Sequence, residues 1–277
     1  MFSISINNIL LIGKNLYNCF NFSIYLLSNI LNVSTNYLFI FYDIKINFLL
    51  YSKYIYLSNK KLFGWPIGYI LKKEKFYKID VLLDIGILVP RYETSIFLEK
   101  LFNVIYKYNI TNILELGYGT GIMSLLLGNF KFLFVKGIDS DLNSFFYAIK
   151  NLYNLKNFNI DFYYNNWTMF YCNKYDFDII FSNPPYINFD SFIFLNNNLI
   201  PFESKKSLLS NNFGLCEIIF IIRFSYMCLN KKGFLLIEHG FRHSFIVRKI
   251  LIYFGYVYVN TYTDQYYYDR ITIGVKL

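Results

Sequence analysis

From residue 110 onward, short apolar runs alternate with longer amphipathic runs, and this alternation constrains the fold more than any other feature of the sequence. Short apolar runs bounded by turn residues predict buried strands, and the longer segments between them predict helices. Strands that alternate with helices form a largely parallel sheet with helices on both faces. We therefore expect an α/β fold whose ligands bind beyond the carboxyl ends of the strands, near the point where the strand order reverses.

The turn residues set the boundaries of the expected elements. Strands are expected at 113–116, 132–138, 161–164, 178–182 and 233–238, followed by an antiparallel pair at 256–262 and 271–276. Helices are expected at 95–108, 122–127, 142–152, 215–229 and 244–254.

The N-terminal part lacks this alternation and favours several short helices. A breaker-rich stretch, Gly64 to Gly68, ends it, and residues 76–89 predict two short strands around Asp84 and Gly86 that form a linking hairpin. The expected helices are Ile6 to Tyr17, Ser23 to Leu31 and Ile44 to Leu57. The expected domains are a small helical domain at 1–72, a linker hairpin at 73–94 and a larger α/β domain at 95–277.

The composition limits what single residues can indicate. The 277 residues include 31 Phe and 28 Tyr, with many Ile, Asn and Lys. The codons of these residues are A/T-rich, which indicates a genome base bias, so a single aromatic residue or lysine carries little functional information. No segment supplies the roughly 20 uninterrupted apolar residues of a membrane span, and the N-terminus lacks the pattern of a signal peptide. A cytoplasmic chain without a membrane segment is expected. Four scattered cysteines form no C-x-x-C pair, which indicates neither a zinc site nor a disulfide framework, and reduced core thiols are expected.

The net charge of +9 leaves a nucleic-acid partner open. Part of the excess lies in one lysine-rich stretch, which is either a solvated face enlarged by the codon bias or a patch for an acidic partner or RNA. The stretch contains Lys60, Lys61, Lys72, Lys73, Lys75 and Lys78 against Glu74 and Asp80.

The segment Asn183-Pro184-Pro185-Tyr186 directly follows an expected buried strand. Its prolines lock φ and donate no N–H, so the backbone there is rigid and its carbonyls are free acceptors. The Asn183 side chain adds another acceptor. Two acceptors suit an N–H2 group with two hydrogens, which indicates chemistry on an amide or an exocyclic amine.

A glycine-rich turn, Gly117-Tyr118-Gly119-Thr120-Gly121, lies between an expected strand and its helix and follows Glu115. Glycines at alternate positions allow a tight turn and a close approach of the backbone to a ligand. Dinucleotide sites favour G-x-G-x-x-G instead, and a phosphate would be poorly served by a nearby carboxylate. The turn therefore indicates a neutral or cationic ligand, with a ligand-free strand–helix turn as the alternative.

Two further residues follow strand ends. Asp139 can accept hydrogen bonds from both hydroxyls of a ribose, while Ser140 or Asp141 can cap the next helix in its place. Trp167 can lie against the face of an adenine or, alternatively, pack in the core. The two histidines, His239 and His243, are interpreted as packing or capping residues.

In this order, the glycine turn, the strand-end acid and Asn-Pro-Pro-Tyr resemble the class I S-adenosylmethionine-dependent methyltransferases. Other segments resemble the release factor glutamine methyltransferase family in particular, over residues 60–277. These segments are Gly64 to Ile70 (G-x-P-x-x-Y-I), Leu88 to Thr94 (L-[IV]-P-R-x-[DE]-T), Ser182 to Ile187 (S-N-P-P-Y-I), Glu238 to Gly240 (E-H-G) and the terminal Asp264, Arg270, Thr272 and Gly274 (D-x5-R-x-[TV]-x-G).

The resemblance implies a seven-stranded, mostly parallel Rossmann-like sheet with a small helical N-terminal domain for substrate recognition. It implies S-adenosylmethionine as the cofactor and the glutamine in the Gly-Gly-Gln motif of peptide chain release factors as the methyl acceptor. A monomer is expected, with no metal and with nucleic acid not expected as a substrate. The implied cofactor-binding residues are Gly117, Tyr118, Gly119, Thr120, Gly121, Asp139, Trp167 and Asn183, and the implied substrate-binding residues are Asn183, Pro184, Pro185 and Tyr186, of which Asn183, Pro184 and Tyr186 are the catalytic set.

The chain departs from the family pattern without losing a reacting group. Tyr118, a larger side chain that can crowd the turn, stands where many relatives have Thr, and Asn166 stands where an acid usually precedes the tryptophan. Ser204 replaces a proline after Glu203, which is expected to loosen that loop, and a glutamine after E-H-G is replaced near Arg242. We expect an active enzyme whose sequence has diverged from the family pattern.

Asn-Pro-Pro-Tyr also occurs in enzymes that methylate amino groups of adenine or guanine. A DNA enzyme of that kind usually has a sizeable recognition domain, and the N-terminal part here carries no obvious base-reading motif. The open alternatives are an RNA amino-group methyltransferase, acting on N6 of adenine or N2 of guanine, and a ribosomal-protein glutamine methyltransferase. Glu93-Thr94 favours the release factor type, and the intact motifs argue against a non-catalytic binding protein.

Overall fold

The structure is a computed structural model that describes residues 3–17, 19–77, 79–91, 94–156, 159–170, 176–188 and 201–277. The chain divides into two compact units between Glu74 and Lys75. Tyr92 and Glu93 of the Pro90–Thr94 motif, Lys78 and Cys172 lie outside the described residues.

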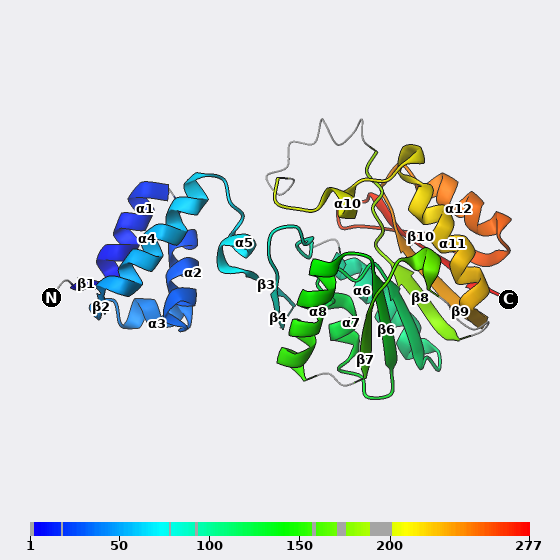
Figure 1. The fold of residues 1–277 in the computed structure, drawn as a ribbon, viewed down its shortest axis with the longest axis horizontal. Helices are drawn as coiled ribbons and strands as arrows, with labels where there is room; N and C mark the ends of the chain where they lie inside the picture. The colour runs from blue at the N-terminus through cyan, green and yellow to red at the C-terminus, as the bar shows by residue number, and fades with distance from the viewer. Residues whose placement is uncertain are drawn as a thin grey trace. The chain divides into compact units, whose positions relative to one another are not determined.

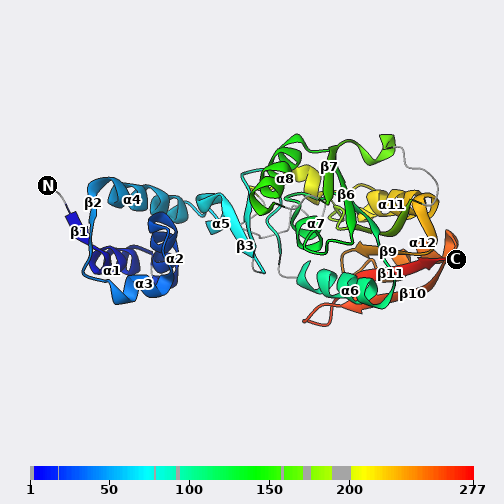
Figure 2. The same ribbon diagram turned by 90° about the horizontal axis from the view of Figure 1, so that it is seen from below.

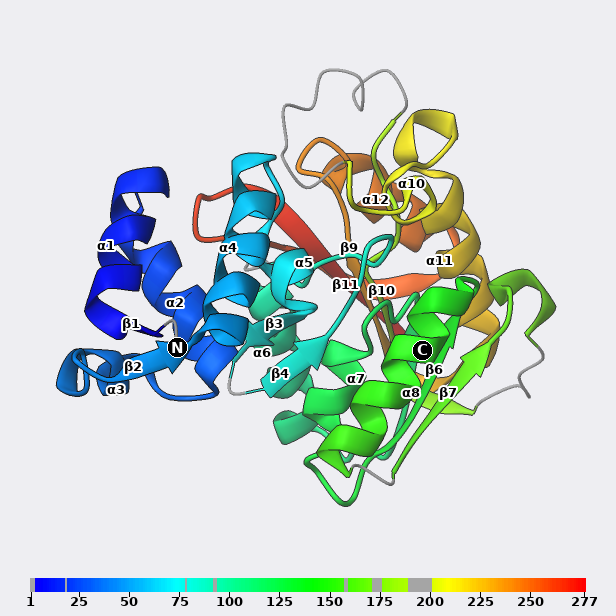
Figure 3. The same cartoon turned by 60° about the vertical axis from the view of Figure 1, so that its left-hand side comes forward.

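The smaller unit is a cluster of helices with a short two-stranded antiparallel ribbon, in which Ser3 pairs with Asn47 (Figure 3). Its core is formed by apolar side chains from the helices, among them the fully buried Leu26, Leu27 and Tyr54. The elements are β1 (Ser3–Ser5), α1 (Ile6–Tyr17), α2 (Phe20–Leu31), α3 (Thr35–Ile40), β2 (Lys45–Asn47), α4 (Phe48–Leu62) and α5 (Ile67–Leu71).

The start of α4 corrects the prediction of a helix from Ile44. The side chain of Asn47 accepts a hydrogen bond from the backbone N–H of Leu50 at 3.0 Å and caps the helix, which therefore begins at Phe48. The residues before the cap pair with β1 instead. Helix α1 has the predicted bounds, Ile6–Tyr17.

The linking hairpin is present, but its strands lie earlier than predicted. They are β3 (Lys73–Phe76) and β4 (Ile79–Leu82), so Asp84 and Gly86 follow the hairpin instead of lying within it. Tyr77, with φ of 53°, occupies the left-handed region beside the turn between them. The prediction placed the turn at the wrong residues because Asp and Gly are the stronger turn signals.

The larger unit is built on a seven-stranded sheet in the order β10-β11-β9-β8-β5-β6-β7 (Figure 1). Strands β7, β6, β5, β8 and β9 are parallel, and β11 and β10 are antiparallel. Figure 2 shows β11 and β10, in red and orange-red, beyond β9 at one edge. This arrangement confirms the α/β fold and the seven-stranded, mostly parallel Rossmann-like sheet.

Side chains alternate between the two faces of this sheet, and each face is covered by helices (Figure 1). Ile113 belongs to the core cluster with α6, α7 and α8, whereas its neighbour Leu114 belongs to the cluster with α11 and α12. Because both faces are buried at the centre of the sheet, the central strands β5 and β8 are mostly apolar, as the sequence predicts.

The elements of the larger unit match the predicted alternation of strands and helices. They are α6 (Thr94–Lys107), β5 (Asn112–Leu116), α7 (Ile122–Leu127), β6 (Phe134–Asp139), α8 (Leu142–Leu155), β7 (Ile160–Tyr164), η1 (Trp167–Met169), β8 (Phe177–Ser182), α10 (Lys205–Leu208), η2 (Asn212–Gly214), α11 (Cys216–Cys228), β9 (Leu229–Glu238), α12 (Ser244–Tyr253), β10 (Tyr256–Thr263) and β11 (Asp269–Lys276).

The prediction of reduced core thiols is wrong. Cys19 and Cys216 are free but exposed, and Cys228, which is fully buried, is disulfide-bonded. In the described part of the chain, no helix combines the length and apolar character needed to cross a bilayer.

Candidate active site

The strand order reverses between β5 and β8, and the two main motifs meet there. The glycine turn follows β5, and Asn183-Pro184-Pro185-Tyr186 follows β8. Leu116 and Ser182, the last residues of these strands, are paired in register, and the Ser182 hydroxyl donates to the Leu116 carbonyl at 2.6 Å. The two motifs are therefore fixed side by side at the edge where open α/β sheets bind ligands.

Positive φ angles are needed at all three glycines of the turn. They are 78° at Gly117, 54° at Gly119 and 79° at Gly121, values that L side chains rarely adopt. A Cβ at Gly121 would lie 2.7 Å from the Phe162 ring, whereas a Cβ at Gly119 would meet nothing within 4 Å. The space beside Gly119 is therefore left open on the ligand side.

Tyr118 does not crowd the turn. Its ring is buried against Phe162, with centroids 4.7 Å apart, and its hydroxyl donates to the Tyr163 carbonyl at 3.3 Å. Burial and the nearby carboxylates of Asp139 and Glu115 raise the pKa of Tyr118 above its ordinary range. Tyr118, which departs from the family pattern, is thus an uncharged side chain that packs against β7.

Asp139 ends β6 and holds the turn through its carboxylate. The carboxylate accepts from the Gly119 N–H and from the Asp141 N–H, both at 2.9 Å. Asp141, not Asp139, caps α8 by accepting from the Ser144 N–H at 2.8 Å, as the sequence allows. Burial raises the pKa of Asp139 to about 6, so the carboxylate is mostly ionised at neutral pH.

Glu115 is a second carboxyl group behind the turn. It is buried, and it accepts from the N–H of Ser124 at 3.1 Å and from the Ser124 hydroxyl. Burial raises its pKa to about 8, which is only partly offset by the hydrogen bonds from Ser124. Of these two carboxyl groups, Asp139 is therefore mostly ionised at neutral pH and Glu115 is mostly protonated.

A cavity of about 260 Å³ opens at these strand ends. Asp139 lies in its wall with Trp167, which belongs to the short helix η1. The indole packs so close to the turn that a Cβ at Gly117 would lie 3.1 Å from it, and its Nε1 is buried without a hydrogen-bond partner. The cavity is lined by Gly86, Leu88, Gly117, Gly119, Asp139, Ser140, Asp141, Ser144, Asn166, Trp167, Asn183, Pro185, Ser204, Lys206, Ser207 and Glu217.

A smaller cavity of about 60 Å³ shares Leu88, Gly117, Gly119 and Asn183 with the first. Among the described residues that line this smaller cavity, Arg91 is the only cation. The other lining residues are Pro90, Thr94, Glu115, Tyr118, Thr120, Ile122 and Met123. The lining of the larger cavity thus combines acidic and aromatic side chains with Lys206, and the lining of the smaller cavity contains Arg91.

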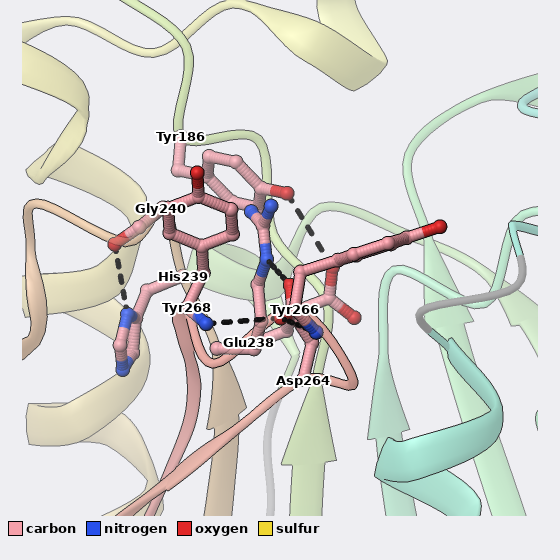
Figure 4. A network of polar contacts seen from close by, with 8 residues as sticks. Tyr186, Glu238, His239, Gly240, Asp264, Tyr266 and Tyr268 are labelled. Carbon is pink, nitrogen blue, oxygen red and sulfur yellow. Dashed lines mark hydrogen bonds and ion pairs between the residues drawn. The ribbon is translucent and has the colours of Figure 1, made fainter.

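The four residues of the Asn-Pro-Pro-Tyr motif occupy different positions. Asn183 lines both cavities, and Pro185 lines the larger one. Pro184 is buried, and Tyr186 lies outside both linings and donates its hydroxyl to Glu238 at 3.4 Å (Figure 4). Of the predicted cofactor-binding residues, only Gly121 lines neither cavity.

Three features of the site escaped sequence reasoning. The Asn151 side chain donates to the Thr120 carbonyl at 3.1 Å and so supports the turn. Ser204, Lys206 and Ser207 line part of the larger cavity. The Arg91 guanidinium pairs with the buried carboxylate of Glu203, just before them, at 2.8 Å. The glutamate–arginine pair was detectable in principle, since both residues belong to motifs, but nothing in the sequence indicates that they meet.

The departures from the family pattern are accommodated. Ser204 caps α10 by accepting from the Lys206 N–H at 3.3 Å. This hydrogen bond stabilises the loop at the position where relatives have a proline. Asn166 lines the larger cavity, and the Arg242 guanidinium lies over the ring of Phe241, 5.3 Å from its centroid.

The two histidines are neutral packing residues. His239 is fully buried; its ring contacts the Thr272 hydroxyl at 2.7 Å and the Gly240 carbonyl at 3.0 Å. Burial lowers its pKa to about 4, and burial also lowers the pKa of His243. Among the described residues, no group of three His, Cys, Asp or Glu side chains could hold a metal ion.

Comparison with solved structures identifies the same architecture. A methyltransferase from Pyrococcus furiosus superposes with a TM-score of 0.53 at 18% identity, covering 79% of this chain and 98% of that one. A ribosomal protein L11 methylase from Lactobacillus delbrueckii subsp. bulgaricus gives a TM-score of 0.51 at 12% identity, covering 74% of this chain and 90% of that one. No protein-family model matches the chain.

Comparison with curated proteins is more specific. A release factor glutamine methyltransferase from Buchnera aphidicola subsp. Acyrthosiphon pisum is 34% identical over 226 residues, which cover 81% of this chain and 80% of the relative. The protein of the same description from Buchnera aphidicola subsp. Schizaphis graminum is 31% identical over 252 residues, covering 91% and 90%.

The sheet order, the glycine turn with its strand-end acid and the Asn-Pro-Pro-Tyr motif define a class I S-adenosylmethionine-dependent methyltransferase. Within that class, the chain belongs to the release factor glutamine methyltransferase family.

Proposed function

We propose that this enzyme transfers a methyl group from S-adenosylmethionine to the side-chain amide nitrogen of the glutamine in the Gly-Gly-Gln motif of peptide chain release factors. The observation that carries the proposal is the position of Asn183, which lines both cavities beside the glycine turn. The similarity to release factor glutamine methyltransferases supports this acceptor over a ribosomal protein or an RNA base.

The residues present fit the cofactor. In the larger cavity, Asp139 offers carboxylate oxygens for two vicinal hydroxyls, and Trp167 offers an apolar ring and an unpartnered buried N–H. Any residue other than glycine at position 119 would project its side chain into the open space there. In the smaller cavity, Arg91 and the neutral Glu115 suit an amino acid moiety. When bound, the cofactor supplies an electrophilic methyl group on a sulfonium.

The protein's part in the reaction is mainly placement. An amide nitrogen is a weak nucleophile, because its lone pair is delocalised, so aligning it contributes more than a general base. The Asn183 side-chain oxygen and the Pro184 carbonyl would accept the two N–H bonds of the amide. The same acceptors stabilise the positive charge that develops on nitrogen in the transition state.

The cavity wall strengthens these contacts. Pro185, Leu88 and Trp167 present apolar surface beside Asn183, which excludes water and lowers the local dielectric. No described side chain near Asn183 is required as a base, because the proton lost from nitrogen can leave after the transfer. Neither histidine lines either cavity, so neither is placed to act as a base on the amide.

We further propose that the enzyme acts as a cytoplasmic monomer without a metal, and that residues 1–72 recognise the substrate protein, 73–94 link and 95–277 catalyse. The exposed apolar side chains of the small unit support a role in binding protein. They include Phe39, Ile40, Phe41, Phe48, Leu49 and Phe63. Two of the lysines near its end, Lys60 and Lys61, lie over aromatic rings, which accounts for part of the lysine-rich stretch without an RNA partner.

The test incubates the enzyme with labelled S-adenosylmethionine and, in separate reactions, a release factor, its Gln→Ala variant at the Gly-Gly-Gln motif, ribosomal proteins and total RNA. We expect label only in the unmodified release factor. Label confined to RNA or to ribosomal proteins would overturn the proposed acceptor.

A further inference from the structure

The tyrosine of the Asn183–Tyr186 motif is held by a buried polar network (Figure 4). Its hydroxyl donates to Oε1 of Glu238, the last residue of β9, and its ring meets His243 edge-on at 6.4 Å between centroids. Glu238 itself is 5% exposed and lines neither cavity. Its hydrogen bond to Tyr186 therefore connects Glu238 to the Asn183–Tyr186 motif.

Tyr186 is the hydrogen-bond donor in this network. Burial and the charge of Glu238 raise the pKa of Tyr186 above its ordinary range, so the phenol stays protonated and donates. Arg270 lies close enough to act electrostatically on both groups and opposes this shift. A phenol committed to a carboxylate in this way is a poor candidate for a proton acceptor from the substrate.

Arg270 is in turn fixed by Asp264, at the opposite end of the β10–β11 turn. Its Nε donates to the buried Asp264 carboxylate at 2.9 Å, and that carboxylate also accepts from the N–H groups of Tyr266 and Tyr268. The Arg270 carbonyl accepts from the N–H of His239 at 2.8 Å. The terminal hairpin is thereby joined to the residue that follows Glu238.

We propose that Glu238 is a positioning residue for the methyl transfer. By holding the Tyr186 hydroxyl, it fixes the end of the rigid Asn183-Pro184-Pro185 segment and thus the acceptors for the amide. A carboxylate is costly to bury, and the hydrogen bond from Tyr186 connects this buried carboxylate to the motif that carries the amide acceptors. This inference rests on the proposed function, since it assigns Glu238 a part in the same reaction.

The test compares Glu238→Ala, Glu238→Gln, Tyr186→Phe and the double variant Glu238→Ala/Tyr186→Phe. Loss of a hydrogen bond to a charged group is expected to lower kcat about 10-fold in Glu238→Ala and in Tyr186→Phe. The double variant should lose no more than the single ones, because the same contact is removed. Glu238→Gln keeps an acceptor oxygen and should recover most of kcat, with the affinity for S-adenosylmethionine unchanged throughout.

Tyr256→Phe is the matched control, because Tyr256 is a buried tyrosine that donates to the Ile222 carbonyl at 3.2 Å, away from the motif. It should lose stability without losing kcat. A second measurement needs no methyl acceptor: amide hydrogen exchange at Ile187, whose N–H donates to the Leu208 carbonyl at 3.0 Å. Exchange should accelerate in Glu238→Ala and not in Glu238→Gln.

Additive losses in the double variant, a fall in cofactor affinity that matches the fall in kcat, or unchanged exchange at Ile187 would each overturn the inference. Failure of the wild-type enzyme to methylate a release factor, together with faster exchange in Glu238→Ala, would instead reject the proposed acceptor and leave the support of the motif by Glu238 intact.

Discussion

The side-chain amide of Asn151 donates to the carbonyl of Thr120 at 3.1 Å, so helix α8 holds the glycine turn in place. The same side chain exchanges two hydrogen bonds with the backbone of Leu82, at 2.8 and 3.0 Å. Asn151 is 1% exposed, and its three partners are backbone groups. One buried amide therefore ties the end of the linking hairpin to the cofactor turn.

Replacing Asn151 by Ala should affect both stability and cofactor binding. Each buried polar group left without a partner costs about 1–3 kcal/mol, so we expect Asn151→Ala to lower the free energy of unfolding by about 3 kcal/mol or more. Because the turn is released, affinity for S-adenosylmethionine should fall about 10-fold, which corresponds to ~1.4 kcal/mol. Urea unfolding and calorimetry measure the two effects.

Asn159→Ala is the matched control. Its side chain also satisfies two backbone carbonyls, those of Phe130 and Leu133 at 3.0 and 2.7 Å, but these belong to the loop before β6. It should lose stability and keep cofactor affinity. Equal affinity losses in the two variants would show that the effect on binding comes from general destabilisation.

The sequence predicts the repeating part of the fold well. Helices α1 and α7 have the predicted bounds because apolar periodicity and turn residues agree there. The three-residue strands β1 and β2 and the short helix α3 are missed, since so few residues carry no period, and the hairpin is misplaced. The contacts of Asn151 and Glu238 join residues 31 to 69 positions apart, and no local pattern specifies such pairs.

The site residues also divide into those that the sequence predicts and those that only the structure reveals. Gly117, Asp139 and Asn183 are predictable, because each follows a strand and all parallel strands end at one edge of the sheet. The orientation of Tyr186 toward Glu238 is not, because it depends on how the terminal hairpin packs against β9. The sequence alone thus predicts where the site lies, and the structure is needed to show what supports it.

Two glycines of the turn should respond differently to the same substitution. Both occupy the left-handed region, which costs a non-glycine residue about 1–2 kcal/mol. Gly121→Ala adds a clash with Phe162 at 2.7 Å, so it should lower the unfolding free energy well beyond that strain. Gly119→Ala projects its methyl into open space at the cavity wall and should lower cofactor affinity more than stability. The reverse ranking in thermal unfolding and calorimetry would contradict this assignment.

Glu115 should make stability depend on pH. Burial raises its pKa from 4.5 to about 8. Between those values the folded protein keeps a proton that the unfolded chain has released, so this group's contribution to stability falls as pH rises and levels off above about 8. In Glu115→Gln, which keeps an acceptor for Ser124, that loss is absent. Relative to the wild type, the variant should gain at least about 1 kcal/mol between pH 5 and pH 9 in urea titrations; parallel stability curves would refute it.

Asp139 should make cofactor affinity depend on pH in the opposite direction. Its pKa is raised to about 6, and an ionised carboxylate accepts hydrogen bonds from the ribose hydroxyls better than a protonated one. Affinity for S-adenosylmethionine should be constant above about pH 7 and fall as pH drops through 6. Asp139→Asn should bind about 10-fold more weakly at pH 8 and show no such fall. Calorimetry at pH 5, 6, 7 and 8 measures both, and unchanged affinity in the variant would exclude the ribose contact.

Asn183 should govern turnover and not cofactor binding. Its side chain lies where the two cavities join, so it can face the acceptor amide while the remaining wall still holds the cofactor. Removing one such transition-state contact typically costs about 10²–10³ in kcat, and we expect at least a 100-fold loss in Asn183→Ala.

Asn166→Ala is the matched control, because Asn166 lines only the larger cavity and should change cofactor affinity with little change in kcat. Steady-state kinetics with a release factor and calorimetry with S-adenosylmethionine separate the two. Since the Asn183 side chain would contribute one of only two acceptors for the amide, near-normal turnover in Asn183→Ala would mean that the nitrogen is aligned by the Pro184 carbonyl and the protein substrate itself.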